Sequence, residues 1–166
     1  MVMPMEKSNQ FKNITMQDIV IRPMTMEDYE DVFDMWQSNS GFGIRTIDDS
    51  KDGIERFITR NPGLSVVALH EGRIIGGVLC GHDGRRGCLY HVCVRVEYRM
   101  LGIGQEMVAR CKAALKQEGI NKINLIAFQK NAIGNRFWQK LNWKHRADCN
   151  YYEENLNLDN VTNFIP

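Results

Sequence analysis

The sequence predicts an α/β (α+β) protein whose mixed, mostly antiparallel and twisted sheet carries helices on both faces. Segments with helical period and segments with strand period alternate along the chain, in an order that one sheet covered on both sides accommodates. Between residues 64 and 94, three apolar strand-like segments follow one another with only short turns between them. Such a run is typical of antiparallel neighbours.

The first third of the chain predicts one strand and two helices. Residues 18–22 alternate weakly, as in a strand. A helix capped by Thr25 follows, and its apolar residues share one face: Tyr29, Val32, Phe33 and Trp36. Residues 38–46 are rich in glycine and serine and predict a loop. A second helix is expected from about residue 49 to residue 59.

The middle of the chain predicts three strands, over residues 64–69, 74–80 and 88–94. The turn before the third strand, residues 81–87, contains an Asp-Gly pair, which is a strong hairpin signal. The three strands therefore form a meander.

The last third predicts, in order, a helix that ends near Gly119, a strand, a helix and a closing hairpin. The last three elements are expected over residues 122–128, 131–141 and 144–156, with the hairpin strands at 144–148 and 151–156. The complete order is β-α-α-β-β-β-α-β-α-β-β.

Length and charge restrict the class of protein. Residues 1–17 show no period and predict a flexible arm, and residues 18–166 predict a single domain. A formal net charge of +1 does not indicate nucleic acid or an anionic membrane as a partner. No apolar run has the length of a membrane span, and the N-terminus does not resemble a secretory signal. We therefore expect a cytoplasmic protein.

The cysteines and histidines do not predict a metal site. The five cysteines are an odd number without a Cys-x-x-Cys pair, and none of the four histidines lies at ligand spacing beside a cysteine pair. Free thiols in a reducing cytosol are the better interpretation.

The most informative stretch is Arg99-x-x-Gly102-x-Gly104, which follows an apolar strand and precedes a helical period. The start of a helix leaves several backbone N–H groups unpaired and carries a partial positive charge. Glycines let this backbone approach an anion closely. The loop therefore predicts a site for the phosphates of a cofactor.

Two common phosphate-binding loops do not fit this sequence. A P-loop needs Lys followed by Ser or Thr after its last glycine, and Gly104 is followed by Gln105 and Glu106. A dinucleotide-binding fingerprint needs a third glycine, where this chain has Met107. A nucleotide-binding domain is therefore disfavoured.

Two motifs in order resemble the GNAT superfamily of N-acetyltransferases. The first runs from Val92 to Gly104, and the second is Asn131-x-x-Gly134-x-x-Phe137-Trp138-x-x-Leu141-Asn142-Trp143. The similarity spans roughly residues 19–156. The hairpin over residues 81–87 also resembles a small bacterial and archaeal subgroup named for ribosomal-protein alanine acetyltransferases.

The resemblance implies that acetyl-coenzyme A is the acetyl donor. Pantetheine would pair with the main chain of Val92 and Val94, and Arg99 would shape the turn or contact phosphate. The pyrophosphate would bind the N–H groups of Met100, Leu101, Gly102, Ile103, Gly104 and Gln105. The second motif would complete the cofactor site with Asn131, Phe137 and Trp138.

The resemblance also implies direct transfer to an amine in a ternary complex, with the oxyanion held by a backbone N–H near Cys93 or Val94. Tyr90 could orient a water that relays the amine proton, or could be an ordinary strand aromatic. Strand alternation puts Cys88, Tyr90, Val92 and Val94 on one face and His91 and Cys93 on the other. Histidine is the side chain best suited to act as a base near neutral pH, so His91 is a candidate, but its face favours packing or solvent.

Several features leave alternatives open. Trp138 stands where the family usually has the tyrosine that protonates the leaving thiolate, so Tyr151 or Tyr152 could replace that acid. A non-catalytic acyl-coenzyme A sensor or interaction module is the alternative function. Asp48 and Asp49 could contact a cationic acceptor, or could be carboxylates near a helix N-terminus. The acceptor could be a small-molecule amine or a peptide N-terminus, and the protein a monomer or a homodimer.

Overall fold

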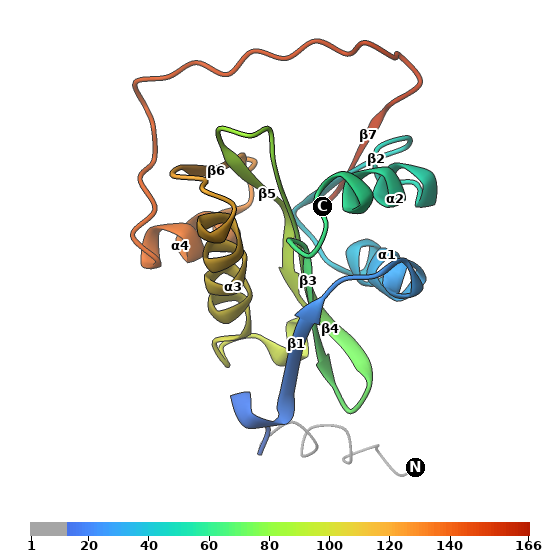
Figure 1. The fold of residues 1–166 in the computed structure, drawn as a ribbon, viewed down its shortest axis with the longest axis vertical. Helices are drawn as coiled ribbons and strands as arrows, with labels where there is room; N and C mark the ends of the chain where they lie inside the picture. The colour runs from blue at the N-terminus through green and yellow to red at the C-terminus, as the bar shows by residue number, and fades with distance from the viewer. Residues whose placement is uncertain (1–12) are drawn as a thin grey trace, which may run out of the picture.

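The computed structural model describes residues 13–166 (Figure 1). Most of the predicted arm, residues 1–12, lies outside the described residues. Within its last part, Ile14 and Met16 pack against the core, and Met16–Asp18 form a 3-10 helix that leads into the first strand.

The main sheet has five strands in the spatial order β1-β3-β4-β5-β6. All neighbours are antiparallel except β5 and β6, which are parallel. The predicted mostly antiparallel, mixed sheet is confirmed. The strands are β1 (Ile19–Pro23), β3 (Val66–His70), β4 (Arg73–His82), β5 (Gly87–Val94) and β6 (Ile123–Leu125).

Helices cover both faces of this sheet (Figure 1), as the sequence predicts. One buried cluster joins the sheet to α1 and α2 through Val32, Trp36 and Ile54, and a second joins it to α3 through Met107 and Cys111. The described helices are α1 (Tyr29–Ser38), α2 (Lys51–Arg60), α3 (Ile103–Gln117) and α4 (Ala132–Lys140), with short 3-10 turns at Met26–Asp28 and Val96–Tyr98.

The predicted closing hairpin is wrong. Residues 144–156 contain no strand, and the chain instead crosses over the end of the sheet to β7 (Thr162–Ile165), as Figure 1 shows. Tyr152 and Leu156 are exposed on this segment, so they have no apolar face to pack against. Asn160 anchors its end by accepting hydrogen bonds from the backbone N–H groups of Ile47 and Asp48.

The predicted loop over residues 38–46 is also wrong, because β7 pairs there with a strand β2 (Phe42–Arg45). Phe42 and Ile44 pack against the α1 cluster, as alternate residues of a strand can. Close packing explains the glycine at position 43, because a Cβ there would lie 2.8 Å from Thr162 Cγ2 and 3.0 Å from the Phe128 ring. The glycines that predicted a loop therefore allow two segments to approach.

An irregularity in β5 determines the geometry of the site. The register between β4 and β5 shifts between Gly77 and Leu79, and His91 adopts a φ of 49°. This is a β-bulge, which adds one residue to β5 and reverses the alternation of side chains beyond it. Just before the bulge, β5 also leaves β6, because their pairing ends at Leu89 and Leu125.

Candidate active site

The start of α3 has the geometry of an anion site. Gly102 is the N-cap of α3 with a φ of 87°, and Met100 before it has a φ of 68°. A Cβ at Gly102 would meet no atom within 4 Å, so the backbone here is open to a ligand. The N–H groups from Gly102 to Gln105 are those that an α-helix leaves without partners of its own.

A hollow adjoins this helix start. Its volume is about 440 Å³, and its lining comes from β1, the preceding 3-10 turn and the first turns of α3: Met16, Ile19, Ile21, Gly102, Gln105, Glu106 and Arg110. Arg110 is held there by Glu106 at 3.2 Å and by the carbonyl oxygen of Ile21 at 2.9 Å. The site therefore has room for a phosphorylated group beside the open N–H groups.

Arg99 braces the loop from inside. Its Nε donates to the carbonyl oxygen of Val94 at 3.1 Å, and its Nη2 donates to Asn39 Oδ1 at 2.9 Å. Asn39 is only 2% exposed and donates in turn to the carbonyl oxygen of Met35. Of the two roles expected for Arg99, these contacts support shaping the turn. Asn39 was missed, because an asparagine after a helix gives no signal of such a contact.

The outer edge of β5 is the second part of the site. Among the described residues, β5 pairs with β6 only from Gly87 to Leu89, so Val92 and Val94 have no strand beside them on that edge. The N–H of Arg95 donates to the carbonyl oxygen of Ile75 on β4 at 2.8 Å. Because the peptide groups of successive strand residues point in opposite directions, those of Val94 point away from β4 and those of Cys93 point toward Gly77. The open edge therefore offers the N–H of Val94, while its carbonyl oxygen already accepts from Arg99.

Cys93 itself is poorly placed for chemistry. Its side chain belongs to the buried cluster beneath α1, and burial raises the pKa of its thiol to about 12. Because its peptide also points toward β4, the geometry favours Val94 over Cys93 for an oxyanion contact.

The second sequence motif supports the loop through α4. Asn131 caps this helix by accepting from the N–H of Gly134 at 2.9 Å, and its Nδ2 donates to the carbonyl oxygen of Gly41. Phe137 lies against the start of α3, since a Cβ at Gly104 would be 3.3 Å from its ring. Trp138 packs between other rings, with centroids 4.8 Å from Phe137 and 4.9 Å from Trp143.

The bulge overturns the predicted faces of β5. Val92 and Val94 pack toward the α3 cluster, whereas Tyr90 contacts Phe57 of α2 and His91 contacts Trp36 of α1. Tyr90 and His91 therefore share the α1/α2 face, and the expectation that Tyr90 lies with Val92 and Val94 is wrong. The extra residue of the bulge is the physical reason.

Tyr90 keeps its proton. Its side chain is 49% exposed, and its ring meets Phe57 edge-on at 5.8 Å. Partial burial and the neighbouring Cys88 raise the pKa of Tyr90 well above its usual range. The phenol can therefore donate a hydrogen bond at neutral pH but cannot act as an ionised base.

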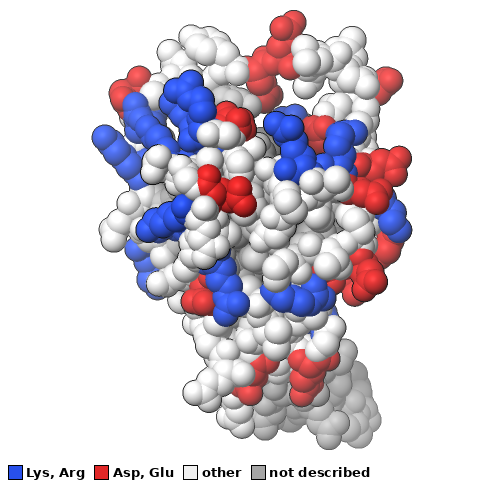
Figure 2. Space-filling view, in the orientation of Figure 1, with Lys and Arg blue, Asp and Glu red and all other residues white. Residues whose placement is uncertain are grey.

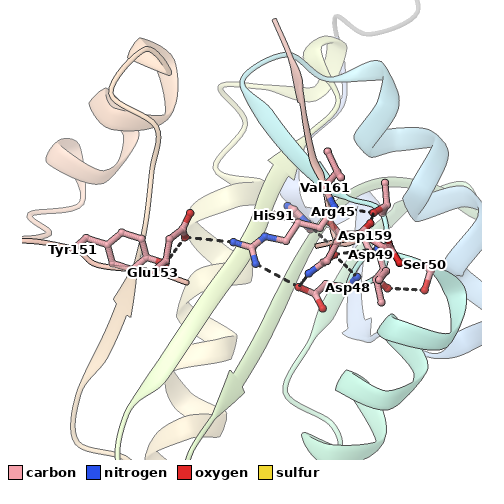
Figure 3. A network of polar contacts seen from close by, with 12 residues as sticks. Arg45, Asp48, Asp49, Ser50, His91, Tyr151, Glu153, Asp159 and Val161 are labelled. Atoms are coloured by element: carbon pink, nitrogen blue, oxygen red, sulfur yellow. Dashed lines mark hydrogen bonds and ion pairs between the residues drawn. The ribbon is translucent and has the colours of Figure 1, made fainter. Parts of the chain in front are cut away.

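A polar network borders this face (Figure 3). His91 Nε2 lies 2.7 Å from Asp49 Oδ1, and both side chains are largely buried. Arg45 reaches toward the crossing segment and pairs with Glu153 at 3.6 Å, and Glu153 accepts from the Tyr151 hydroxyl at 2.9 Å. The sequence expectation that His91 packs is confirmed, because its ring lies against Trp36 and Phe42, but its contact with a buried carboxylate was not foreseen.

Two further expectations can be compared with the described part of the chain. No group of three His, Cys, Asp or Glu side chains there could hold a metal ion. No helix there is both long and apolar enough to cross a membrane. On the face drawn in Figure 2, basic and acidic side chains are interspersed.

Comparison with known proteins decides the family. A family model described as the acetyltransferase (GNAT) family matches residues 25–143. The chain belongs to the GNAT family. An acetyltransferase of Photorhabdus laumondii is 33% identical over 130 residues, covering 76% of this chain and 87% of that protein. An acetyltransferase of Sodalis glossinidius is 31% identical over 124 residues, covering 75% and 86%.

Solved structures show the same fold. The PaiA N-acetyltransferase of Thermoplasma acidophilum in complex with coenzyme A has a TM-score of 0.66 at 21% identity, covering 74% of this chain and 87% of that one. AAC(6')-Iy in complex with a bisubstrate analogue has a TM-score of 0.65 at 17% identity, covering 82% and 98%.

The activity follows from the family and the named relatives. This GNAT protein is an enzyme that transfers an acetyl group from acetyl-coenzyme A to an amine. The expected acetyltransferase activity is confirmed over the alternative of a non-catalytic sensor.

Proposed function

We propose that the site residues divide between two faces of the sheet. Acetyl-coenzyme A lies along the open edge of β5, with its pyrophosphate at the N–H groups between Gly102 and Gln105 and its pantetheine beside Val94. The acceptor amine approaches from the α1/α2 face, where Tyr90 is exposed. The observation that carries this proposal is the open edge of β5 next to the start of α3, where a Cβ at Gly104 would lie 3.8 Å from Val94 Cγ2.

The transfer is direct, within a ternary complex. A neutral amine attacks the thioester carbonyl, the N–H of Val94 stabilises the oxyanion, and the carbon–sulfur bond breaks to release coenzyme A. Tyr90 orients the water next to the amine through its protonated hydroxyl. Phe137 and Trp138 shape the cofactor channel and Asn131 fixes the start of α4, so these three residues act by packing and capping.

The acceptor is a cationic amine, either a small molecule or a peptide N-terminus. Acidic side chains on this face support the proposal, since those of Asp48 and Glu153 are 49% and 58% exposed. The structure of AAC(6')-Iy, whose bound bisubstrate analogue joins coenzyme A to an acetylneamine, supports this class of acceptor. All five cysteines are unpaired, which supports a reducing compartment such as the cytoplasm.

A coenzyme A release assay with three acceptors tests this function: spermidine, the aminoglycoside sisomicin and a peptide that begins with alanine. We expect turnover with at least one of them, and a product whose mass increases by one acetyl group. Binding of acetyl-coenzyme A without transfer to any acceptor would contradict the proposed acceptor classes. Competition by ATP as strong as that by coenzyme A would contradict the cofactor site.

A further inference from the structure

The β5 bulge brings a histidine and a carboxylate from distant parts of the chain into contact. His91 lies on the bulge, and Asp49 lies in the turn before α2 (Figure 3). Their Nε2 and Oδ1 atoms are 2.7 Å apart, and the two side chains are 14% and 7% exposed. A buried contact this short fixes the orientation of the imidazole ring.

The carboxylate is held independently of the histidine. Asp49 Oδ2 accepts from the backbone N–H of Arg45 at 2.7 Å, and its main-chain carbonyl accepts from the Tyr29 hydroxyl at 2.9 Å. Oδ2 and the main chain of Asp49 therefore have donors other than the histidine, which leaves Oδ1 for the imidazole. Because an ionised carboxylate only accepts hydrogen bonds, His91 Nε2 carries the hydrogen of the neutral ring, and Nδ1 keeps its lone pair.

The free nitrogen of this imidazole is accessible. His91 Nδ1 has no hydrogen-bond partner among the described residues. Every buried side-chain nitrogen or oxygen of these residues does have a partner, so Nδ1 is not buried. Nδ1 therefore reaches solvent. The ring itself is held by Trp36 and Phe42, with centroids 4.6 Å and 5.4 Å away.

Among residues 13–166, few charged or titratable groups lie near the ring. From α1 there is Tyr29, from β2 and the following turn there are Arg45, Asp48 and Asp49, and from β5 itself there are Tyr90 and Cys93. Arg45 directs its guanidinium to Asp48 and Glu153, so Asp49 is the charge in contact with the imidazole. This arrangement is typical of a general base that is oriented by a carboxylate.

We propose that His91, positioned by Asp49, is the general base that deprotonates the acceptor ammonium, either directly or through one water. The proposal rests on the acetyl transfer argued above. The acceptor R–NH₃⁺ gives one proton to Nδ1, and the lone pair of the neutral amine forms the new N–C bond. The C–S bond breaks, the second amine proton neutralises the leaving thiolate, and His91 returns the first proton to solvent. The products are the acetamide, coenzyme A and one released proton.

The test uses variants that keep the bulge. Asparagine tolerates the positive φ of residue 91 and cannot act as a base, so His91→Asn is the main variant and His91→Gln is the second. Asp49→Asn tests the positioning residue. The matched control is His82→Gln, which changes a hydrogen-bonded histidine at the end of β4, where Nδ1 accepts from Gly84.

Each variant is assayed with spermidine, sisomicin and the alanine peptide over a range of pH. At pH 7, both His91 variants should lose about 10²–10³-fold in kcat, Asp49→Asn should lose less, and the KM for acetyl-coenzyme A should stay unchanged. Above the pKa of the acceptor amine, about 10 for an alkylamine, the His91 variants should approach the wild-type rate because the amine is already neutral. His82→Gln should follow the wild-type profile throughout.

Three outcomes overturn the proposal. If the wild type turns over and the His91 variants keep its rate and pH profile, the base role alone fails. If the variants stay inactive at high pH while folded and bound to acetyl-coenzyme A, His91 has a structural role. If the wild type binds acetyl-coenzyme A but acetylates none of the three acceptors, the proposed acceptor function fails, and the base role fails with it.

Discussion

The glycines at the two ends of α3 allow a matched test of the cofactor site. Gly102 precedes the helix with a φ of 87° and Gly119 follows it with a φ of 77°, and a Cβ at either position would meet no atom within 4 Å. Alanine therefore introduces the same backbone strain at both, about 1–2 kcal/mol, without a steric clash. Only Gly102 lies at the N–H groups that we assign to the pyrophosphate.

We expect Gly102→Ala and Gly119→Ala to destabilise the protein alike, lowering Tm by about 2–8 °C in a chain of this size. Only Gly102→Ala should weaken acetyl-coenzyme A, because relieving the strain turns the loop N–H groups away from the phosphates. An affinity loss of about tenfold corresponds to about 1.4 kcal/mol.

Isothermal titration calorimetry and thermal unfolding measure the two effects separately. The site assignment is refuted if both variants bind acetyl-coenzyme A as the wild type does, or if Gly119→Ala loses as much affinity as Gly102→Ala. A large loss of Tm in one variant alone would show that the backbone strain differs between the two positions. The affinities would then be measured at a temperature below the unfolding transitions of both variants.

Three further changes test the neighbouring assignments. Gly104→Val should weaken acetyl-coenzyme A more than tenfold in calorimetry, since even a Cβ there lies 3.3 Å from the Phe137 ring; an unchanged affinity in a folded variant would contradict this. Trp138→Phe should lower kcat only modestly, because the indole packs between rings, and loss of activity with intact cofactor binding would show a direct role for the indole. Tyr90→Phe should lower kcat about ten- to a hundredfold at unchanged acetyl-coenzyme A affinity, and an unaffected rate would remove Tyr90 from the mechanism.

The strand, loop and helix start that we assign to the cofactor were predictable because their signals are local. The order of strand, Gly102 loop and helix lies within a few residues, and each part follows from propensity, period or the needs of a helix start. The inward contacts of Arg99 were not predictable. They depend on Asn39, which is 60 residues away in the sequence and has no pattern that connects it to the loop.

The pairing of β2 with β7 could not be derived from local pattern for a related reason. Each strand has only four residues, and the partners Phe42 and Ile165 lie far apart in the sequence. Strands this short carry little period, and Gly43 looks like a loop residue until Thr162 and Phe128 are placed against it. The predicted hairpin at residues 144–156 failed because alternation alone does not supply a partner strand.

The acceptor half depends on one extra residue, which strand periodicity cannot show. Alternation assigned Tyr90 and His91 to opposite faces, and the bulge puts both on the α1/α2 face. A non-glycine residue with positive φ costs free energy that its surroundings must offset, here through the contacts of His91 with Asp49 and Trp36. Such outliers concentrate at functional sites, which supports the acceptor site that we propose on this face.

The bulge also connects the two halves of the site, and this makes a last prediction possible. The pairing of β5 with β6 ends at Leu89, two residues before His91. The bulge therefore lies next to the open cofactor edge and also sets the direction of the imidazole. Deleting His91 removes the extra residue and restores a regular register with β4. We expect the deletion to lower both acetyl-coenzyme A affinity and kcat, because it removes the imidazole and straightens β5 where the open edge begins, while Tyr90 and Val92 keep their present faces.

The comparison with His91→Asn separates the two effects. That variant keeps the bulge, so calorimetry should show wild-type affinity for acetyl-coenzyme A while kcat falls. Circular dichroism establishes that the deletion variant is folded before its affinity is compared. A folded deletion variant that binds acetyl-coenzyme A as tightly as the wild type would show that the cofactor edge opens independently of the bulge. The separation of β5 from β6 would then have to arise from the short β6 strand alone.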